Sequence, residues 1–267
     1  MPSPADRPAV PAGLLTTTEV SEAFRDRDPT AVLVTGSCEQ HGAHLPLDTD
    51  LYLAERVAAA ACASTGDLVL PALPFGYNEK ELGFPGTVSV PAPVYLDLLV
   101  GLGRSLRRSG WGRLVIVNGH GWNNDLVRAA THVLNEDPQF RTACCSYWSL
   151  CLPEVRELRE SPTPGGMAHG CEFETSLMLH LRPESVRTEL IADEISYRRL
   201  PGLHHDLLEK SPMFMPEVFG ELSATGIIGS PSLATAEKGR VWFEAAAERL
   251  SSFLLGFRDA FPRKEVA

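Results

Sequence analysis

Five side chains that could bind a metal ion lie within twelve residues of one another in the first fifth of the sequence. Oxygen and nitrogen ligands of these types suit Zn²⁺, Mn²⁺ or Fe²⁺. The stretch 36–50 that carries them directly follows the apolar run 31–34, which is typical of a buried strand. A strand end is a rigid place from which to aim ligands, so the sequence predicts a loop that holds one or two catalytic metal ions. The five side chains are Glu39, His41, His44, Asp48 and Asp50.

Spacing within this loop favours three of the five. Glu39 and His41 are two residues apart, and on an extended backbone such side chains point the same way. Asp50 must return through a turn, which Pro46 makes feasible. Its carboxylate could then bridge two metal ions about 3.5–4 Å apart. The alternative interpretation is a solvated polar loop in which Thr49 or Asp50 caps the following helix.

Two later segments add groups of the same chemistry. His120 stands between two glycines directly after the apolar run 113–117, where the alternative is a tight turn with a surface histidine. Further on, His169 precedes Glu172 by three residues, a spacing that can share one helix face. His169 could act as an acid or base near neutral pH, and Glu172 or Glu174 could bind metal. The alternative is that the two glutamates only stabilise the start of a helix.

Alternating strand and helix patterns must position these groups. They predict an α/β fold with a mainly parallel sheet and helices on both faces, in which ligands bind at the carboxyl ends of the strands. We expect one domain over residues 1–267, with 1–12 as a flexible, proline-rich tail. The long loop 71–91 is rich in glycine and proline, and such loops are usually functional. Strands are predicted at 31–35, 68–70, 113–117 and 142–148, and helices at 16–27, 51–63, 93–109, 124–135, 172–181 and 235–258.

Composition excludes several classes of partner. The net charge of -10 argues against binding to nucleic acid or to an anionic membrane, because both attract basic surfaces. No run of 18 apolar residues predicts a membrane span, and the N-terminus lacks the apolar core of a signal peptide. The six cysteines form no CxxC pair, so we expect them to stay reduced in a cytoplasm.

The ordered motifs carry a resemblance to a known family. Residues 36–50 resemble the opening signature of the creatininase (creatinine amidohydrolase) family. The segments 84–87 (FPGT), 117–121 (VNGHG), 169–176 and 229–239 resemble its later motifs in the same order. The resemblance spans roughly residues 14–255.

This resemblance implies a three-layer α/β/α sandwich, a homo-oligomer that is often hexameric, and two divalent ions of zinc, manganese or iron. Carried over by motif position, His169 matches the catalytic histidine, and Glu174 is a further candidate for proton transfer. In creatininase the last ligand is a glutamate two residues after the histidine of the third motif, a place taken here by Trp122. The sequence leaves open whether Glu172 or Glu174 replaces it, although Glu172 fits the later family motif. The implied metal ligands are Glu39, His41, Asp50, His120 and Glu172.

The substrate loop departs from the family pattern. Relatives commonly carry Ser-x-Glu-His before the FPGT motif, whereas this chain has NEKE at 78–81. These changes argue against assuming creatinine, so we expect a small-molecule substrate with a non-peptide C–N bond: a lactam, cyclic amide or formamide. The candidate substrate contacts are Asn78, Glu81, Trp122 and His44.

Three alternatives remain at this point. One is a peptidase acting on a mycofactocin-type precursor peptide, disfavoured because that branch has histidine where this chain has Glu172. Another is a hydrolase of a C–C or lactone bond in a sugar-like ring. The last is a non-catalytic binding protein on the same fold, which the complete set of candidate ligands disfavours.

Overall fold

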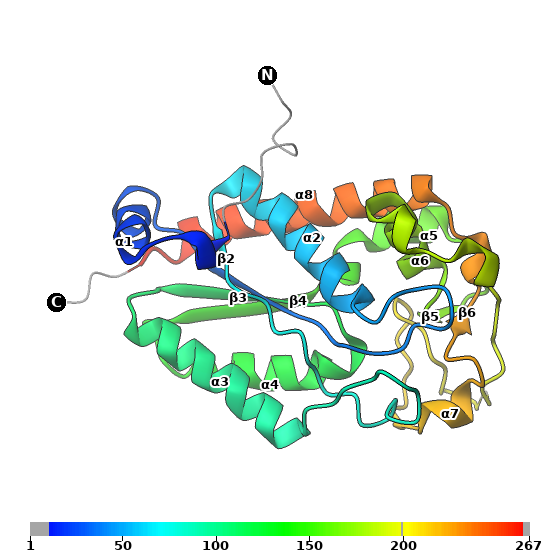
Figure 1. Ribbon diagram of the computed structural model, residues 1–267. Coiled ribbons are helices and arrows are strands. Elements are labelled where there is room, and N and C mark those ends of the chain that lie inside the picture. Colours follow the sequence, from blue (N-terminus) through cyan, green and yellow to red (C-terminus); the bar gives the residue numbers. More distant parts are fainter. Residues whose placement is uncertain (1–10, 199, 264–267) are drawn as a thin grey trace.

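A four-stranded parallel sheet forms the centre of the protein (Figure 1). The computed structural model describes residues 11–198 and 200–263 of the chain. Apolar, largely β-branched runs form the inner strands, as the sequence predicts. The fourth strand ends earlier than expected, because residues 147–151 turn into a 3₁₀ helix. In sheet order, the strands are β2 (Leu68–Val69), β1 (Ala31–Thr35), β3 (Arg113–Asn118) and β4 (Arg141–Ser146).

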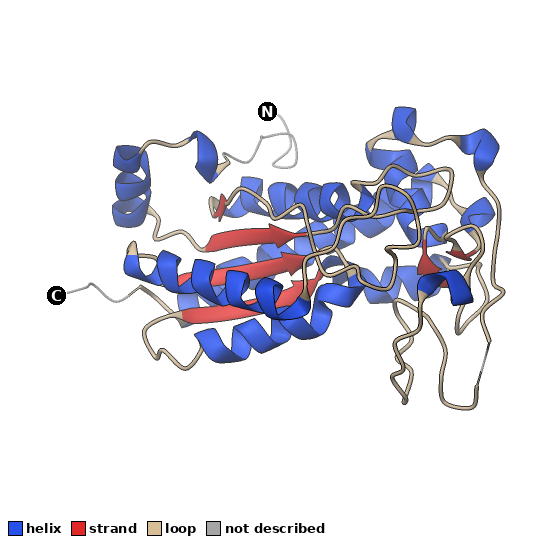
Figure 2. Ribbon diagram, turned by 60° about the horizontal axis from the view of Figure 1, so that its bottom comes forward, coloured by secondary structure: helices blue, strands red, loops and turns tan. Residues whose placement is uncertain are grey.

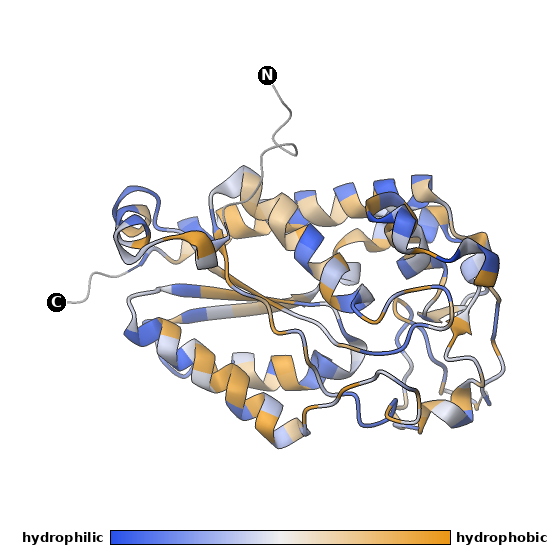
Figure 3. Ribbon diagram, in the orientation of Figure 1, coloured by the Kyte–Doolittle hydropathy of each residue, from blue (hydrophilic) through white to orange (hydrophobic). Residues whose placement is uncertain are grey.

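Helices cover both faces of this sheet, which confirms the predicted three-layer α/β/α arrangement (Figures 1 and 2). Helices α2 (Thr49–Thr65), α6 (Glu172–Leu181) and α8 (Ala236–Ala260) lie on one side, and α3 (Ala92–Arg108) and α4 (Asn124–Leu134) lie on the other. Helices α3 and α8 carry both apolar and polar positions along their length (Figure 3), as expected when one side of a helix is buried. The remaining helices are α1 (Thr17–Asp26), α5 (Leu152–Leu158) and α7 (Phe219–Leu222).

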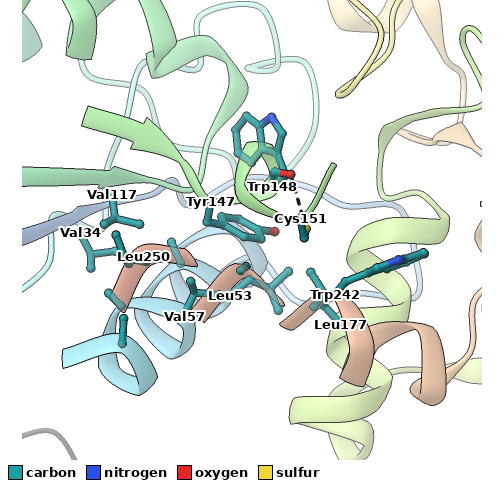
Figure 4. Close-up of a cluster of buried hydrophobic side chains, with 14 of the residues drawn as sticks. Val34, Leu53, Val57, Val117, Tyr147, Trp148, Cys151, Leu177, Trp242 and Leu250 are labelled. Atoms are coloured by element: carbon teal, nitrogen blue, oxygen red, sulfur yellow. Dashed lines mark hydrogen bonds between the residues drawn. The ribbon is translucent and has the colours of Figure 1, made fainter. Parts of the chain in front are cut away.

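Side chains that alternate along the inner strands create two separate cores. Val34 and Val117 face the layer of α2, α6 and α8, where Leu250 lies near Val34 and Trp242 lies beside Leu177 (Figure 4). Leu33 and Ile116 point to the opposite face and pack against α3 and α4. Each such buried aliphatic side chain contributes about 1.5–3 kcal/mol, so both helical layers are held firmly on the sheet.

A second, small antiparallel sheet lies beyond the carboxyl ends of the main strands. It pairs β5 (Met167–His169) with β6 (Ile228–Gly229), and irregular chain surrounds it (Figure 2). The polar loop that follows β1 runs toward this sheet (Figure 1). The strand ends therefore meet the β5–β6 segment at one edge of the molecule.

The predicted flexible tail over residues 1–12 lies mostly outside the described residues. Residues 1–10 lie outside the described part of the chain, while Pro11 bridges to Val69 and Ala12–Leu14 form a 3₁₀ turn. A single domain over the whole chain stays a prediction. Among the described residues, no helix is both long and apolar enough to cross a membrane.

Candidate metal centre

Asp50 stands at the centre of a buried cluster of carboxylates and imidazoles. It lies in the first turn of α2 with only 3% of its surface exposed. Its Oδ1 is 3.1 Å from Nε2 of His41, and its Oδ2 is 2.9 Å from Nδ1 of His120. Ser37 donates a further hydrogen bond of 2.9 Å to Oδ2. The two oxygens of one carboxylate thus face two different imidazoles.

Two sets of three potential ligands share this carboxylate. One set is Glu39, Asp50 and His120, and the other is His41, Asp50 and Glu174; within each set the ligand atoms lie within 4.8 Å of one another. A third set joins Glu39 and His41 to His169. A carboxylate common to two sets could bridge two metal ions.

Backbone carbonyls fix how the two imidazoles present themselves. Nδ1 of His41 donates to the carbonyl oxygen of Glu39 at 3.3 Å, and Nε2 of His120 donates to that of Tyr77 at 3.1 Å. These bonds turn the other ring nitrogens, Nε2 of His41 and Nδ1 of His120, toward Asp50, where they would offer lone pairs to a bound ion. Metal-binding histidines are oriented in the same way, through the ring nitrogen that does not bind the ion.

Burial and charge make this point of the protein favour cations. Burial would raise the pKa of Asp50, but the imidazoles of His41 and His120 hold the pKa well below its usual range. Burial would conversely lower the pKa of His41, yet Asp50 raises it to about 10. Burial and the nearby Glu81 charge raise the pKa of Glu39. Oε2 of Glu39 is buried without a hydrogen-bond donor among the described residues, so a bound cation would satisfy an otherwise costly group.

Strand pairing explains how distant residues meet here. Thr35 and Asn118 are direct neighbours at the ends of β1 and β3, and Oγ1 of Thr35 donates to Oδ1 of Asn118 at 3.0 Å. The loops that carry Glu39 and His120 therefore start side by side. Between them Gly119 packs so closely on α2 that a Cβ atom there would lie 2.2 Å from the carbonyl oxygen of Asp50.

We expect Gly119→Ala to push α2 away from β3 and to weaken both folding and metal binding. Such overpacking costs about 1–3 kcal/mol, and the displaced element carries Asp50. Urea unfolding and the metal content of the purified variant measure the two effects. Gly121→Ala is the matched control, because a Cβ atom at Gly121 would meet nothing within 4 Å. Equal stability and metal content in the two variants would contradict this role of Gly119.

The two glutamates at the start of α6 face opposite directions. Oε1 of Glu174 lies 3.9 Å from Nε2 of His41, within the cluster. Glu172 is fully buried elsewhere, where its carboxylate accepts hydrogen bonds from the backbone of Glu160 and Ser161 and pairs with Lys238 at 2.6 Å. Residues two apart on a helix are rotated by about 200°, so they cannot share a site. The structure thus contradicts the expected placement of Glu172 among the metal ligands.

His169 reaches the cluster from the small sheet. It ends β5 and is 8% exposed, and its ring lies 4.3 Å from that of His41. Its Nε2 donates to the carbonyl oxygen of Gln40 at 2.7 Å, while Nδ1 lies 3.8 Å from Oε1 of Glu39. The expectation that His169 shares a helix face with Glu172 is wrong, because the helix begins only at Glu172.

Two of the four expected substrate contacts lie together beside the cluster. Nε1 of Trp122 donates to Oε1 of Glu81 at 3.2 Å. Asn78 is fully buried in the same loop as Glu81, and its amide donates to the carbonyl oxygen of Val88. His44 is instead 2.8 Å from Oγ1 of Thr175, and burial lowers its pKa to about 4.

Gln40 is the residue that sequence reasoning missed. Its Nε2 lies 3.2 Å from Oε2 of Glu81, 3.1 Å from Nε2 of His169 and 3.1 Å from the carbonyl oxygen of Gly226. It joins three segments that are far apart in the sequence. Its place between Glu39 and His41 was the only signal, and strict alternation along an extended chain directs it away from them.

Comparison with known proteins identifies the family. The model of the family described as "Creatininase: Creatinine amidohydrolase" matches residues 13–254. The chain belongs to the creatininase family. Its curated relatives include the mycofactocin precursor peptide peptidase of Mycolicibacterium smegmatis, which is 35% identical over 86% of this chain and 85% of that protein. The creatinine amidohydrolase of Pseudomonas putida is 27% identical over 94% of this chain and 96% of that protein.

Solved creatininase structures share the fold. A manganese creatininase superimposes with a TM-score of 0.80 at 27% identity, covering 95% of this chain and 99% of that one. A mutant creatininase of the Zn–Zn type aligns with a TM-score of 0.77. This creatininase-family chain is therefore a hydrolase with a candidate metal-binding site.

These relatives bear on the peptidase alternative. The sequence argument against it rested on Glu172, which lies outside the cluster, and the more similar of the two relatives above is a peptidase. Residue 172 therefore no longer separates the branches.

Proposed function

We propose that the protein is a dinuclear metal-dependent amidohydrolase that cleaves a non-peptide C–N bond of a small molecule, such as a lactam, cyclic amide or formamide. The observation that carries the proposal is the pair of ligand sets sharing Asp50. Glu39, Asp50 and His120 would hold one ion, and His41, Asp50 and Glu174 would hold the other. Zinc, manganese and iron all suit these donors.

The ions, when bound, would supply a water molecule with a pKa near neutrality and would polarise the amide carbonyl. The protein supplies geometry and a proton carrier. Burial of the ligands keeps bulk water out; the carbonyl oxygens of Glu39 and Tyr77 fix the imidazoles. Because Gln40 binds Nε2–H of His169, Nδ1 is free beside the cluster to take a proton and pass it to the departing nitrogen.

A second candidate is hydrolysis of a peptide bond. It is favoured by the 35% identity to the mycobacterial precursor peptide peptidase. The same cluster would act on a peptide, because peptide bonds and lactams are both amides. Because every candidate ligand is buried, we favour a small-molecule substrate over a peptide.

Two further proposals concern the setting of the enzyme. All six cysteines are free, which supports the cytoplasmic location expected from the sequence. A homo-oligomer, such as a hexamer, is proposed from the family resemblance.

A panel of lactams, cyclic amides, formamides and short peptides tests the substrate. We expect hydrolysis of at least one non-peptide amide, lost after chelation and restored by Zn²⁺, Mn²⁺ or Fe²⁺. Cleavage of peptides alone would replace the first candidate with the second. Hydrolysis that survives complete removal of metal would contradict the proposal.

A further inference from the structure

Glu81 is a buried carboxylate whose charge no cationic side chain balances. Only 1% of its surface is exposed. Within the described chain it forms no ion pair with lysine or arginine, and even the neighbouring Lys80 makes none. Among the residues that the structure describes, the one basic group within 4.0 Å of its carboxylate is Nε2 of His169 at 3.8 Å, and that nitrogen already donates to the carbonyl oxygen of Gln40.

The partners of Glu81 do not require a charge. Trp122 and Gln40 each donate one neutral N–H group to it, at 3.2 Å in both cases. A glutamine side chain could accept a hydrogen bond from Trp122 equally well. Burying a carboxylate without a cation is costly, so the negative charge needs an explanation beyond anchoring these neighbours.

The surroundings of Glu81 suit a cation that carries N–H groups. The indole of Trp122 is half-buried and directs its Nε1–H at the carboxylate, which fixes the position of the carboxylate. Oδ1 of Asn78, in the same loop, is a second buried acceptor, and it has no donor among the described residues. A carboxylate and an amide oxygen together match the donors and charge of an ammonium, amidinium or guanidinium group.

We propose that Glu81, with Trp122 and Asn78, binds a cationic nitrogen group of the substrate. His169 contacts both Glu81 and Glu39, so this subsite lies one imidazole ring from the metal-binding cluster. The bound group would therefore sit close to the bond that is cleaved. This inference rests on the proposed hydrolase, since it names the charge of that enzyme's substrate.

A binding experiment on the metal-loaded protein tests the subsite without any need for turnover. Methylguanidinium and the similarly shaped, neutral methylurea are titrated while the NMR signal of the Trp122 indole N–H is followed. A Trp122→Phe variant assigns that signal among the four tryptophans of the chain. We expect methylguanidinium to shift the signal with at least tenfold higher affinity than methylurea.

Charge-removing variants complete the test. Glu81→Gln should bring the two affinities within about threefold of each other, whereas Glu79→Gln, on the exposed neighbour, should leave the preference intact. Equal affinities in the unmodified protein, or a preference that survives Glu81→Gln, would overturn the proposal. Equal affinities measured on the unmodified protein are enough to refute the proposal, so the test does not depend on whether the Glu81→Gln variant folds.

Metal content and turnover separate this inference from the proposed function. A hydrolase that binds metal but prefers neutral amides would refute only the role of Glu81. Cation binding at Trp122 in a protein without metal-dependent hydrolysis would refute only the proposed reaction. For cationic amides, we expect Glu81→Gln to raise KM more than it lowers kcat.

Discussion

Replacing Asp50 with asparagine is expected to lower hydrolysis by about a thousandfold, or about 4 kcal/mol in the activation barrier, and to strip metal from both positions. One oxygen of this carboxylate faces His41 and the other faces His120. An asparagine keeps one oxygen but turns the other into an NH₂ group, which cannot bind a cation. Elemental analysis of the purified variant and steady-state kinetics measure the two losses.

The control for this variant is Asp48→Asn, two residues before Asp50 at the N-cap of α2. The side chain of Asp48 is 50% exposed and pairs with Arg182 at the surface, an interaction that typically contributes less than about 1 kcal/mol. We expect its metal content and kcat to match those of the unmodified protein. An Asp50→Asn protein that keeps two tightly bound ions would refute the bridging role.

The second large effect is a contrast between Glu174→Gln and Glu172→Gln. Glu174 faces His41 and Asp50, so its loss should empty one metal position and lower kcat at least a hundredfold, with little change in stability. Glu172 pairs with Lys238 and binds the backbone at 160–161. Its replacement should keep the metal but lower the free energy of unfolding by about 2 kcal/mol.

Metal analysis, kinetics and urea unfolding on both proteins decide between the two glutamates. The opposite pattern, with metal lost from Glu172→Gln and retained by Glu174→Gln, would restore the assignment expected from the sequence motif. Equal effects in both variants would contradict the division of roles between the two glutamates.

The grouping of the first candidate ligands could be predicted because their positions depend on local sequence. The apolar run 31–34 predicts β1. The extended backbone of the loop that follows predicts that the side chains of Glu39 and His41 point the same way. The same reasoning applied to β3 and His120. Parallel pairing of Thr35 with Asn118 then brings both loops together, which the alternation of strands and helices already indicates.

The phase of α6 could not be predicted in the same way. The spacing predicts that His169 and Glu172 share a helix face, but β5 ends at His169 and the helix starts three residues later. A helix start that moves by a single residue rotates every following side chain by about 100°. Glu172 pairs with Lys238, which lies 66 residues further along the chain. No local sequence pattern predicts such a contact.

Gln40 and Glu81 show the same limit for polar contacts. Their meeting depends on loops 41 residues apart in the sequence. The departure from the family motif at 78–81 identified Glu81 as a change in the substrate loop. Only the structure shows that its carboxylate is buried without a lysine or arginine partner among the described residues.

The number of divalent ions bound per chain tests the central claim most directly. The protein is purified without added chelator, and its zinc, manganese and iron are quantified together with its hydrolytic activity. We expect two ions per active chain, with activity lost as they are removed and regained as they are restored. Full activity with fewer than one ion per chain would contradict the dinuclear centre around Asp50.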